Sequence, residues 1–490
     1  MADYDIKDLE YWDAKIQEKA QEFGLSCYDQ EFEVCDHFNM LGAMAYSGMP
    51  SHYPHWSYGK AYEKLKTLYD YGISGLPYEM VINTNPALAY LMRDNTLDLQ
   101  ILTIAHVYGH NDFFKNNFTF RSTRPEFTLV TFKVHADRVR SYIEDPSIGL
   151  EKVEAVLDAA HALSLQCRRN LATRKLSRKE QEERVQEAAL SPEDPFRRIH
   201  KQPEYVAPDL TKVPFEPDED VLLFIRDYNP YLSEWEKDLL TIVHEEAQYF
   251  VPQIETKIMN EGWASYWHRE ILNSLHLPEA LHWGFLVHHN QVVCPFPRGL
   301  NPYHVGLKLW DDIAHRYDEA KKGRICEDHR NDYENFGGKT SDLGMKSGRE
   351  KLFEVRRADR DVSYLGQFLS AHLMREMDMF EYEPRDGNLI ISKVSSREHW
   401  RDIKETLIKN VVGMGSIPVI KVTDADYDKA RVLHLAHYHD GRDLQLEYAE
   451  KTLGYLFQLW GREVAIQTIV NGKSILLVMN DKGFMTKPVK

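Results

Sequence analysis

Apolar residues recur at helical spacing over most of the first 380 positions of this chain. Between residues 8 and 24, Leu9, Trp12 and Ile16 fall on one face of a predicted helix. A similar pattern covers residues 232–250, and Pro252, which follows it, is expected to end or kink that helix. Residues 1–382 are therefore predicted to form a large, mainly α-helical domain. Further helices are expected at residues 58–71, 97–117, 131–144, 149–166, 255–275, 306–321 and 363–379.

From residue 383 the pattern changes to alternating strand-like and helical segments. Strands are expected at residues 389–394, 417–422, 432–437, 464–470 and 475–479, and helices at residues 396–409 and 444–460. Asn471-Gly472, between the last two strands, is typical of a tight hairpin turn. This order predicts a small ferredoxin-like α+β domain over residues 383–490, which makes the whole chain α+β. The segment has no cluster of acids and histidines, so a regulatory or interaction role is expected for it.

Composition narrows the possible functions. The formal net charge of −16 argues against nucleic-acid binding, which needs a basic surface.

The polar, charged stretch from 168 to 217 is expected to be a solvated helix and linker within the first domain. The chain shows neither a signal peptide nor an apolar run of the roughly 18–20 residues that a membrane span needs. The five cysteines form no CxxC pair, so a reduced, cytoplasmic protein without a disulfide framework is expected.

The apolar helix predicted at residues 97–117 carries two histidines four residues apart. His106 and His110 face the same way on a helix, which is the spacing by which two imidazoles bind one metal ion. Asp112 follows closely and is predicted to hold one of the rings in a fixed tautomer. The alternative is a pair of core histidines hydrogen-bonded to backbone or acidic groups.

A second candidate segment lies at residues 241–270, where acids and histidines stand among aromatic residues. Glu261 and His268 fall on one face of the helix predicted at residues 255–275. Glu245 and Glu246 point about 100° apart, so only one of them can face a site beside that helix.

The sequence NEGWASY around Glu261 resembles the glutamate-bearing helix of gluzincin metallopeptidases. Those enzymes also need an upstream HExxH motif. The upstream sequence here is HEEAQ, with Gln248 at the position of the second histidine, so this segment alone does not predict a conventional zincin site.

Combining the two segments gives a complete donor set. His106, His110 and Glu261 are predicted to bind zinc or another divalent metal and to leave one position open for water. Glu245 or Glu246 is the predicted general base, and His268 the predicted acid or oxyanion partner. This hypothesis requires the two segments to meet in the folded protein.

The longer sequence motifs identify a family. HWSYGKAYEKLK, YEMVINTNPALAYLMRDN, AHVYGHNDFFKNN, EEAQYFVPQIETKIMNEGWASYWH, LNPYHVGLKLWDDI and DVSYLGQFL cover most of residues 50–380. They closely resemble the SpoVR family (stage V sporulation protein R), which has YcgB-like relatives in non-sporulating bacteria. The C-terminal region resembles the separate C-terminal domain of that family. His106, His110, Glu246, Glu261 and His268 all lie inside the matching motifs.

The resemblance implies a cytoplasmic protein that takes part in forming the spore cortex, a peptidoglycan layer, or in stationary-phase stress responses. It also implies a PrkA-type serine kinase and a YhbH/YeaH-type protein as partners. Two functions follow as hypotheses. The first is a metal-dependent amide hydrolase that acts on peptides or peptidoglycan precursors. The second is a non-catalytic adaptor in the kinase pathway, in which the histidines and acids form a buried polar network.

Overall fold

The computed structural model describes residues 4–73, 75–169, 174–189, 212–296, 299–323, 345–385, 388–394, 399–410 and 412–489. Contacts within the chain define two compact units: residues 1–138 with 250–416, and residues 139–249 with 417–490. Helices α5 (Thr128–Glu144) and α9 (Glu234–Glu255) each begin in one unit and end in the other. Each unit therefore combines two separate stretches of chain, whereas the sequence predicts consecutive domains divided at residue 382.

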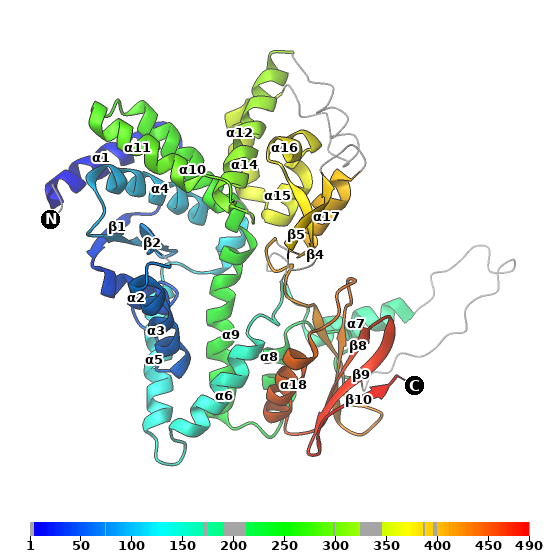
Figure 1. The fold of residues 1–490 in the computed structure, drawn as a ribbon. Coiled ribbons are helices and arrows are strands. Elements are labelled where there is room, and N and C mark those ends of the chain that lie inside the picture. Colours follow the sequence, from blue (N-terminus) through cyan, green and yellow to red (C-terminus); the bar gives the residue numbers. More distant parts are fainter. Residues whose placement is uncertain are drawn as a thin grey trace, which may run out of the picture. The chain divides into compact units, whose positions relative to one another are not determined.

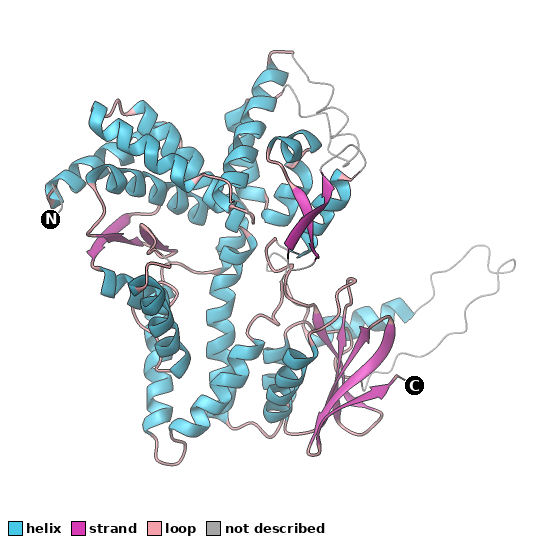
Figure 2. Cartoon of the chain, viewed as in Figure 1, coloured by secondary structure: helices cyan, strands magenta, loops and turns pink. Residues whose placement is uncertain are grey.

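The first unit is mainly helical, with two small sheets (Figures 1 and 2). One sheet has the order β1-β3-β2, with β1 parallel and β2 antiparallel to β3; in the other, β4 pairs with β5. Besides its parts of α5 and α9, the unit contains α1 (Ile6–Glu22), β1 (Gln30–Cys35), α2 (His37–Ala45), α3 (Trp56–Asp70), β2 (Glu79–Ile82), β3 (Ala87–Met92), α4 (Leu97–Asn116), the 3-10 helix η1 (Phe118–Ser122), α10 (Lys257–Ser274), α11 (Glu279–Val292), α12 (Pro302–Lys321), α14 (Gly348–Ala358), α15 (Asp361–Phe368), α16 (Ala371–Glu376), β4 (Phe380–Arg385), β5 (Asn388–Val394) and α17 (Trp400–Asn410).

Helix α4 forms the centre of the first unit. Every residue from Leu99 to Phe114 is buried, because α1, α10, α11 and α14 all pack against this helix. Such a helix buries its polar residues along with its apolar ones, and buried polar groups need partners. The polar side chains of α4 are therefore held in fixed positions inside the core.

Helix α10 passes very close to two neighbouring helices. A Cβ atom added to Gly109 of α4 would lie 2.6 Å from the Cα of Ala264, and one added to Gly262 would lie 2.4 Å from the Cα of Gly306 on α12. At the start of α10, the Asp361 carboxylate accepts hydrogen bonds from the backbone N–H groups of residues 258 and 259, both at 2.8 Å. These contacts fix where α10 starts along α4 and how closely the two helices pack.

Replacing Gly262 by alanine is expected to destabilise the protein by about 1–3 kcal/mol, because α10 and α12 would have to separate. Chemical denaturation monitored by circular dichroism would measure this loss. Gly366→Ala is the matched control, since an added Cβ in α15 meets nothing within 4 Å. Equal stability of the two variants would contradict this account of the packing.

The second unit combines helices with a five-stranded sheet of order β10-β9-β8-β7-β6. Strands β7 and β8 are parallel and are joined through α18, whereas the other neighbouring strands are antiparallel. Besides its parts of α5 and α9, the unit contains α6 (Leu150–Leu163), α7 (Arg178–Ala189), α8 (Val221–Tyr228), β6 (Ile420–Tyr427), β7 (Val432–His437), α18 (Leu446–Trp460), β8 (Val464–Val470), β9 (Lys473–Asn480) and β10 (Gly483–Pro488).

The α+β class predicted from the sequence is confirmed, and so is the hairpin at Asn471-Gly472, which joins β8 to β9. The ferredoxin-like detail needs correction. Strand β5 pairs with β4 in the first unit, so the sheet of the second unit contains one βαβ crossover rather than two. Pro252 lies inside α9, which continues to Glu255. Among the described residues, no helix combines the length and apolar character needed to span a membrane.

Candidate metal centre

The three residues predicted as metal ligands meet in the first unit. His106 and His110 lie one turn apart on α4, with exposures of 2% and 6%. Glu261, on α10, places its Oε2 atom 3.6 Å from His106 Nε2 and 3.4 Å from His110 Nε2. The close approach of α10 to α4 therefore brings two segments that are far apart in the sequence to one point (Figure 1).

The strand β2 adds a further ligand-type residue, Glu79, that sequence analysis missed. Glu79 Oε1 lies 3.9 Å from His106 Nε2, and ligand atoms of Glu79, His106 and His110 all lie within 4.8 Å of one another. Burial raises the pKa of Glu79 to about 7; the charge of His110 opposes this rise and that of Glu261 adds to it. A lone glutamate in a short strand usually faces solvent, so only the tertiary structure shows that Glu79 lies beside the candidate ligands.

The geometry of these donors fits a divalent cation. His106 Nε2 and Glu261 Oε2 are buried, and neither has a hydrogen-bond partner. Metal–ligand bonds of roughly 2.0–2.2 Å in a tetrahedral arrangement separate ligand atoms by about 3.4 Å, close to the two distances from Glu261. The donor set of two imidazoles and a carboxylate is also the type that zinc prefers. The residues present therefore fit a zinc-like ion.

The charge of Glu261 is stabilised by the histidines. Burial alone would raise the pKa of Glu261, but its contacts with His106 and His110 outweigh burial and hold the pKa well below its usual range. Burial would likewise lower the pKa of His110, yet the neighbouring Glu261 raises it. Burial lowers the pKa of His106 to about 4, so this imidazole is neutral near pH 7. A neutral imidazole is the form that binds metal.

Each candidate histidine ligand is oriented through its other ring nitrogen. His110 Nδ1 lies 2.9 Å from the Oδ1 atom of Asn260, which can only accept, so Nδ1 carries a proton, and in the neutral ring Nε2 keeps its lone pair. His106 Nδ1 lies 2.9 Å from His268 Nδ1, and His268 Nε2 lies 2.7 Å from His289 Nδ1. Burial also lowers the pKa values of His268 and His289, the latter to about 4.

These three neutral rings have one arrangement that leaves His106 Nε2 free for a metal. His106 donates from Nδ1 to His268, and His268 donates from Nε2 to His289 Nδ1. The sequence assigns His268 as an acid or oxyanion partner. The structure places it fully buried behind His106 with both ring nitrogens bonded, an arrangement that would orient the candidate ligand His106.

His268→Ala is expected to weaken metal affinity about 10–100-fold, the usual effect of losing a group that orients a ligand. Competition with a chromogenic chelator would measure the change. His268→Asn, whose amide oxygen can accept from His106, is expected to restore part of the affinity. Unchanged affinity in His268→Ala would show that His268 does not orient His106.

Asp112 does not orient a histidine, contrary to the prediction from sequence. Two residues beyond His110 it faces another side of α4, because each residue advances by about 100°. Its fully buried carboxylate accepts hydrogen bonds from Arg356 Nη1 at 2.6 Å, Trp263 Nε1 at 2.9 Å and the Ser26 backbone N–H at 2.7 Å. Asp112 thus joins α4 to α10 and α14, and the orienting role falls to Asn260 and His268.

Glu245 and Glu246, the predicted bases, lie on the part of α9 that belongs to the second unit. Their catalytic role therefore stays a prediction. His244, in the same motif, forms a hydrogen bond of 2.8 Å with Asp220 within that unit, so one nitrogen of its ring already has a protein partner.

A cavity of about 270 Å³ opens at the candidate ligands. Tyr303, on α12, contributes to its wall, and the Tyr303 ring stacks on that of His106 with the ring centres 5.9 Å apart. The charge of Glu261, followed by burial, raises the pKa of the Tyr303 phenol, which therefore stays a proton donor. The cavity is lined by Pro77, Glu79, Val81, His110, Phe114, Gln253, Lys257, Asn260, Glu261 and Tyr303.

Comparisons with known proteins agree with the sequence motifs. The family model described as "SpoVR like protein" matches residues 3–416, and "SpoVR-like C-terminal domain" matches residues 418–471. "Uncharacterized protein YcgB" of Escherichia coli (strain K12) is 32% identical over 484 residues, which cover 95% of this chain and 92% of that protein. No solved structure matches. On these matches, the chain belongs to the SpoVR family.

Proposed function

We propose that this protein is a metal-dependent amide hydrolase. The observation that carries the proposal is the pair of buried atoms without hydrogen bonds, His106 Nε2 and Glu261 Oε2, which face each other beside His110 at metal-ligand spacing. Burying such groups without a hydrogen bond costs free energy, which a bound cation would recover.

The chain supplies a group for each step of amide hydrolysis. A divalent cation held by His106, His110 and Glu261 would polarise the amide carbonyl and lower the pKa of a water molecule. Glu79, whose Oε1 lies 3.9 Å from His106 Nε2, would take a proton from that water. Tyr303 would donate a hydrogen bond to the carbonyl oxygen as negative charge develops there.

The substrate class follows from the cavity and the family. A volume of about 270 Å³ is at or below the small end of the range for ligand pockets, so it would admit one acyl or amino-acid group rather than a folded protein. The family resemblance to sporulation proteins favours peptides or peptide-bearing peptidoglycan precursors. Roles in cortex formation or stress responses, and the kinase partnership, are predictions from the same resemblance.

The test is hydrolysis of short peptides and peptidoglycan stem peptides by protein that contains metal. Glu79→Gln is expected to keep the metal while turnover falls about 10²–10⁴-fold, since it removes the base and leaves the ligands in place. Glu31→Gln, an exposed glutamate on β1, is the control and should keep full turnover. Protein with a full complement of metal that cleaves none of these amides would refute the proposal, as would undiminished turnover in Glu79→Gln.

A further inference from the structure

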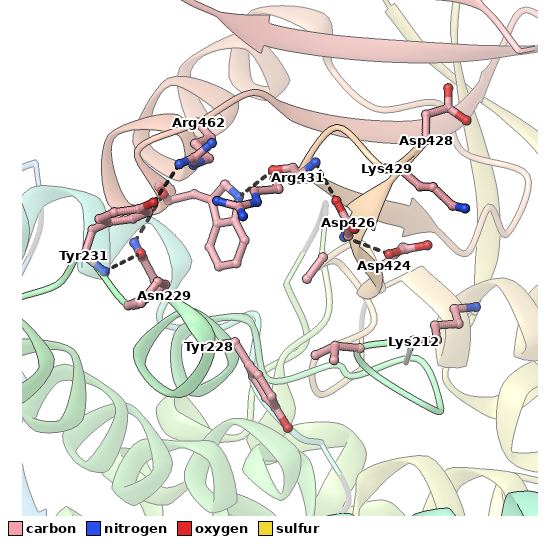
Figure 3. Close-up of a pocket in the computed structure, with 14 residues that line it drawn as sticks. Lys212, Tyr228, Asn229, Tyr231, Asp424, Asp426, Asp428, Lys429, Arg431 and Arg462 are labelled. Atoms are coloured by element: carbon pink, nitrogen blue, oxygen red, sulfur yellow. Dashed lines mark hydrogen bonds between the residues drawn. The ribbon is translucent and has the colours of Figure 1, made fainter. Parts of the chain in front are cut away.

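A second cavity, of about 720 Å³, lies within the second unit and shares no residue with the metal centre (Figure 3). Its walls come from the end of α8 and the turn that follows it, the β6–β7 hairpin, the end of α18 and residues 212–213. This volume is in the range of pockets that enclose small organic ligands.

The walls of this cavity are held in place by hydrogen bonds. The Asn229 side-chain amide, which is 4% exposed, donates to the carbonyl oxygens of Leu459 at 2.8 Å and Trp460 at 3.2 Å, at the end of α18. Its oxygen accepts from the Tyr231 backbone N–H at 3.0 Å. Residues 213 and 425 are joined by a backbone hydrogen bond of 2.7 Å. The cavity is therefore formed before any ligand arrives.

Two guanidinium groups, those of Arg431 and Arg462, lie at one end of the cavity (Figure 3). Arg462 donates to the Tyr231 hydroxyl at 2.7 Å and lies over the same ring. Among the described residues, no acid forms an ion pair with Arg431; the nearby Asp426 carboxylate accepts from the Arg431 backbone N–H instead, at 2.7 Å. In the part of the chain that the structure describes, neither guanidinium therefore forms an ion pair with a carboxylate, although the net charge of the chain is −16. Paired guanidiniums of this kind suit a phosphate or carboxylate.

The remaining walls supply rings and hydrogen-bond acceptors. Tyr228 and Tyr231 are 36% and 64% exposed, and each ring has one face covered, that of Tyr228 by Phe224 and that of Tyr231 by Arg462. The other face of each ring is the one that a planar group could contact. Asp424, Asp426 and Asp428 lie on the hairpin side, away from Arg462, and would accept hydrogen bonds from hydroxyl or amino groups (Figure 3).

The β6–β7 hairpin has an unusual backbone where it forms this wall. Its pairing register shifts on both sides of Asp424, and the non-glycine residues Asp428, Lys429 and Arg431 have φ values of 55°, 56° and 55°. Left-handed conformations cost about 1–2 kcal/mol each in such residues. Bulges and strained residues of this kind often direct side chains into binding sites.

We propose that this cavity binds a nucleoside monophosphate. The phosphate lies between Arg431 and Arg462, the base packs against the tyrosine rings, and the sugar or base donors face the hairpin aspartates. This site is independent of the proposed hydrolase function.

Isothermal titration of the full chain with AMP, GMP, CMP and UMP tests the assignment, with inorganic phosphate and adenosine titrated separately. At least one monophosphate is expected to bind more tightly than inorganic phosphate or adenosine does. Arg431→Ala and Arg462→Lys are each expected to weaken binding at least tenfold. Arg462→Lys keeps the positive charge but loses the planar guanidinium, which can donate two parallel hydrogen bonds. Lys473→Ala, an exposed cation in the β8–β9 hairpin, should leave binding unchanged.

Three outcomes would overturn the proposal. The first is that no monophosphate binds at millimolar concentration. The second is equal affinity for inorganic phosphate alone, which would indicate an anion site without ring recognition. The third is unchanged affinity in both arginine variants. Circular dichroism of each variant would confirm that the fold is retained.

Discussion

Glu261→Ala is expected to reduce bound divalent metal from about one ion per chain to a trace. Glu261 supplies the negative charge of the donor set and approaches both histidines, at 3.6 and 3.4 Å. Two neutral imidazoles would remain, and they alone bind zinc far more weakly than a set with a carboxylate. Elemental analysis of protein purified without chelators would measure the change. Glu261→Gln, which keeps the shape but removes the charge, is expected to lose most of the metal as well.

The control for this experiment is Glu270→Ala on the same helix. Glu270 pairs with Arg269, and its side chain is 40% exposed, so its loss should not affect the metal centre. Near-ultraviolet circular dichroism would show that both variants are folded. A Glu261→Ala protein that keeps a full equivalent of metal would rule out this carboxylate as a ligand.

Arg356→Ala is expected to destabilise the protein by about 3–5 kcal/mol, the usual cost of breaking a buried ion pair from one side. Arg356 and Asp112 are 5% and 0% exposed, and Arg356 Nη1 lies 2.6 Å from both carboxylate oxygens. Without the guanidinium, Asp112 would remain as a buried anion with only neutral donors. Urea denaturation followed by circular dichroism would measure the loss.

Arg357→Ala provides the comparison, because the adjacent arginine is exposed and should cost less than about 0.5 kcal/mol. The double variant Arg356→Met with Asp112→Asn should recover part of the lost stability, since it leaves no buried charge. If Arg356→Ala were as stable as Arg357→Ala, the ion pair would not be holding α4 and α14 together.

Local spacing in the sequence predicted the ligand-type residues of the candidate centre. His106 and His110 stand four apart on an apolar helix, and the motif around Glu261 points to a ligand glutamate. The spacing of residues within each segment does not predict the distance between the two segments in the folded protein. That depends on the glycines at positions 109 and 262, which let α10 approach α4 and α12 closely.

Other parts of the site depend on tertiary contacts that no local pattern contains. Glu79 comes from a short strand and reaches the histidines only because β2 lies beside α4. Asp112 was misassigned because its partner, Arg356, lies 244 positions away. The two discontinuous units also depend on tertiary contacts. Helical periodicity in α5 and α9 does not show that each helix passes from one unit to the other.

The most direct test of the metal centre is an anomalous difference map from crystals of protein purified without chelators, recorded at the absorption edge of the metal found by elemental analysis. We expect a single strong peak about 2.0–2.2 Å from the Nε2 atoms of His106 and His110 and from the Glu261 carboxylate. A map without a peak there, with the two imidazoles hydrogen-bonded to protein groups instead, would contradict the account.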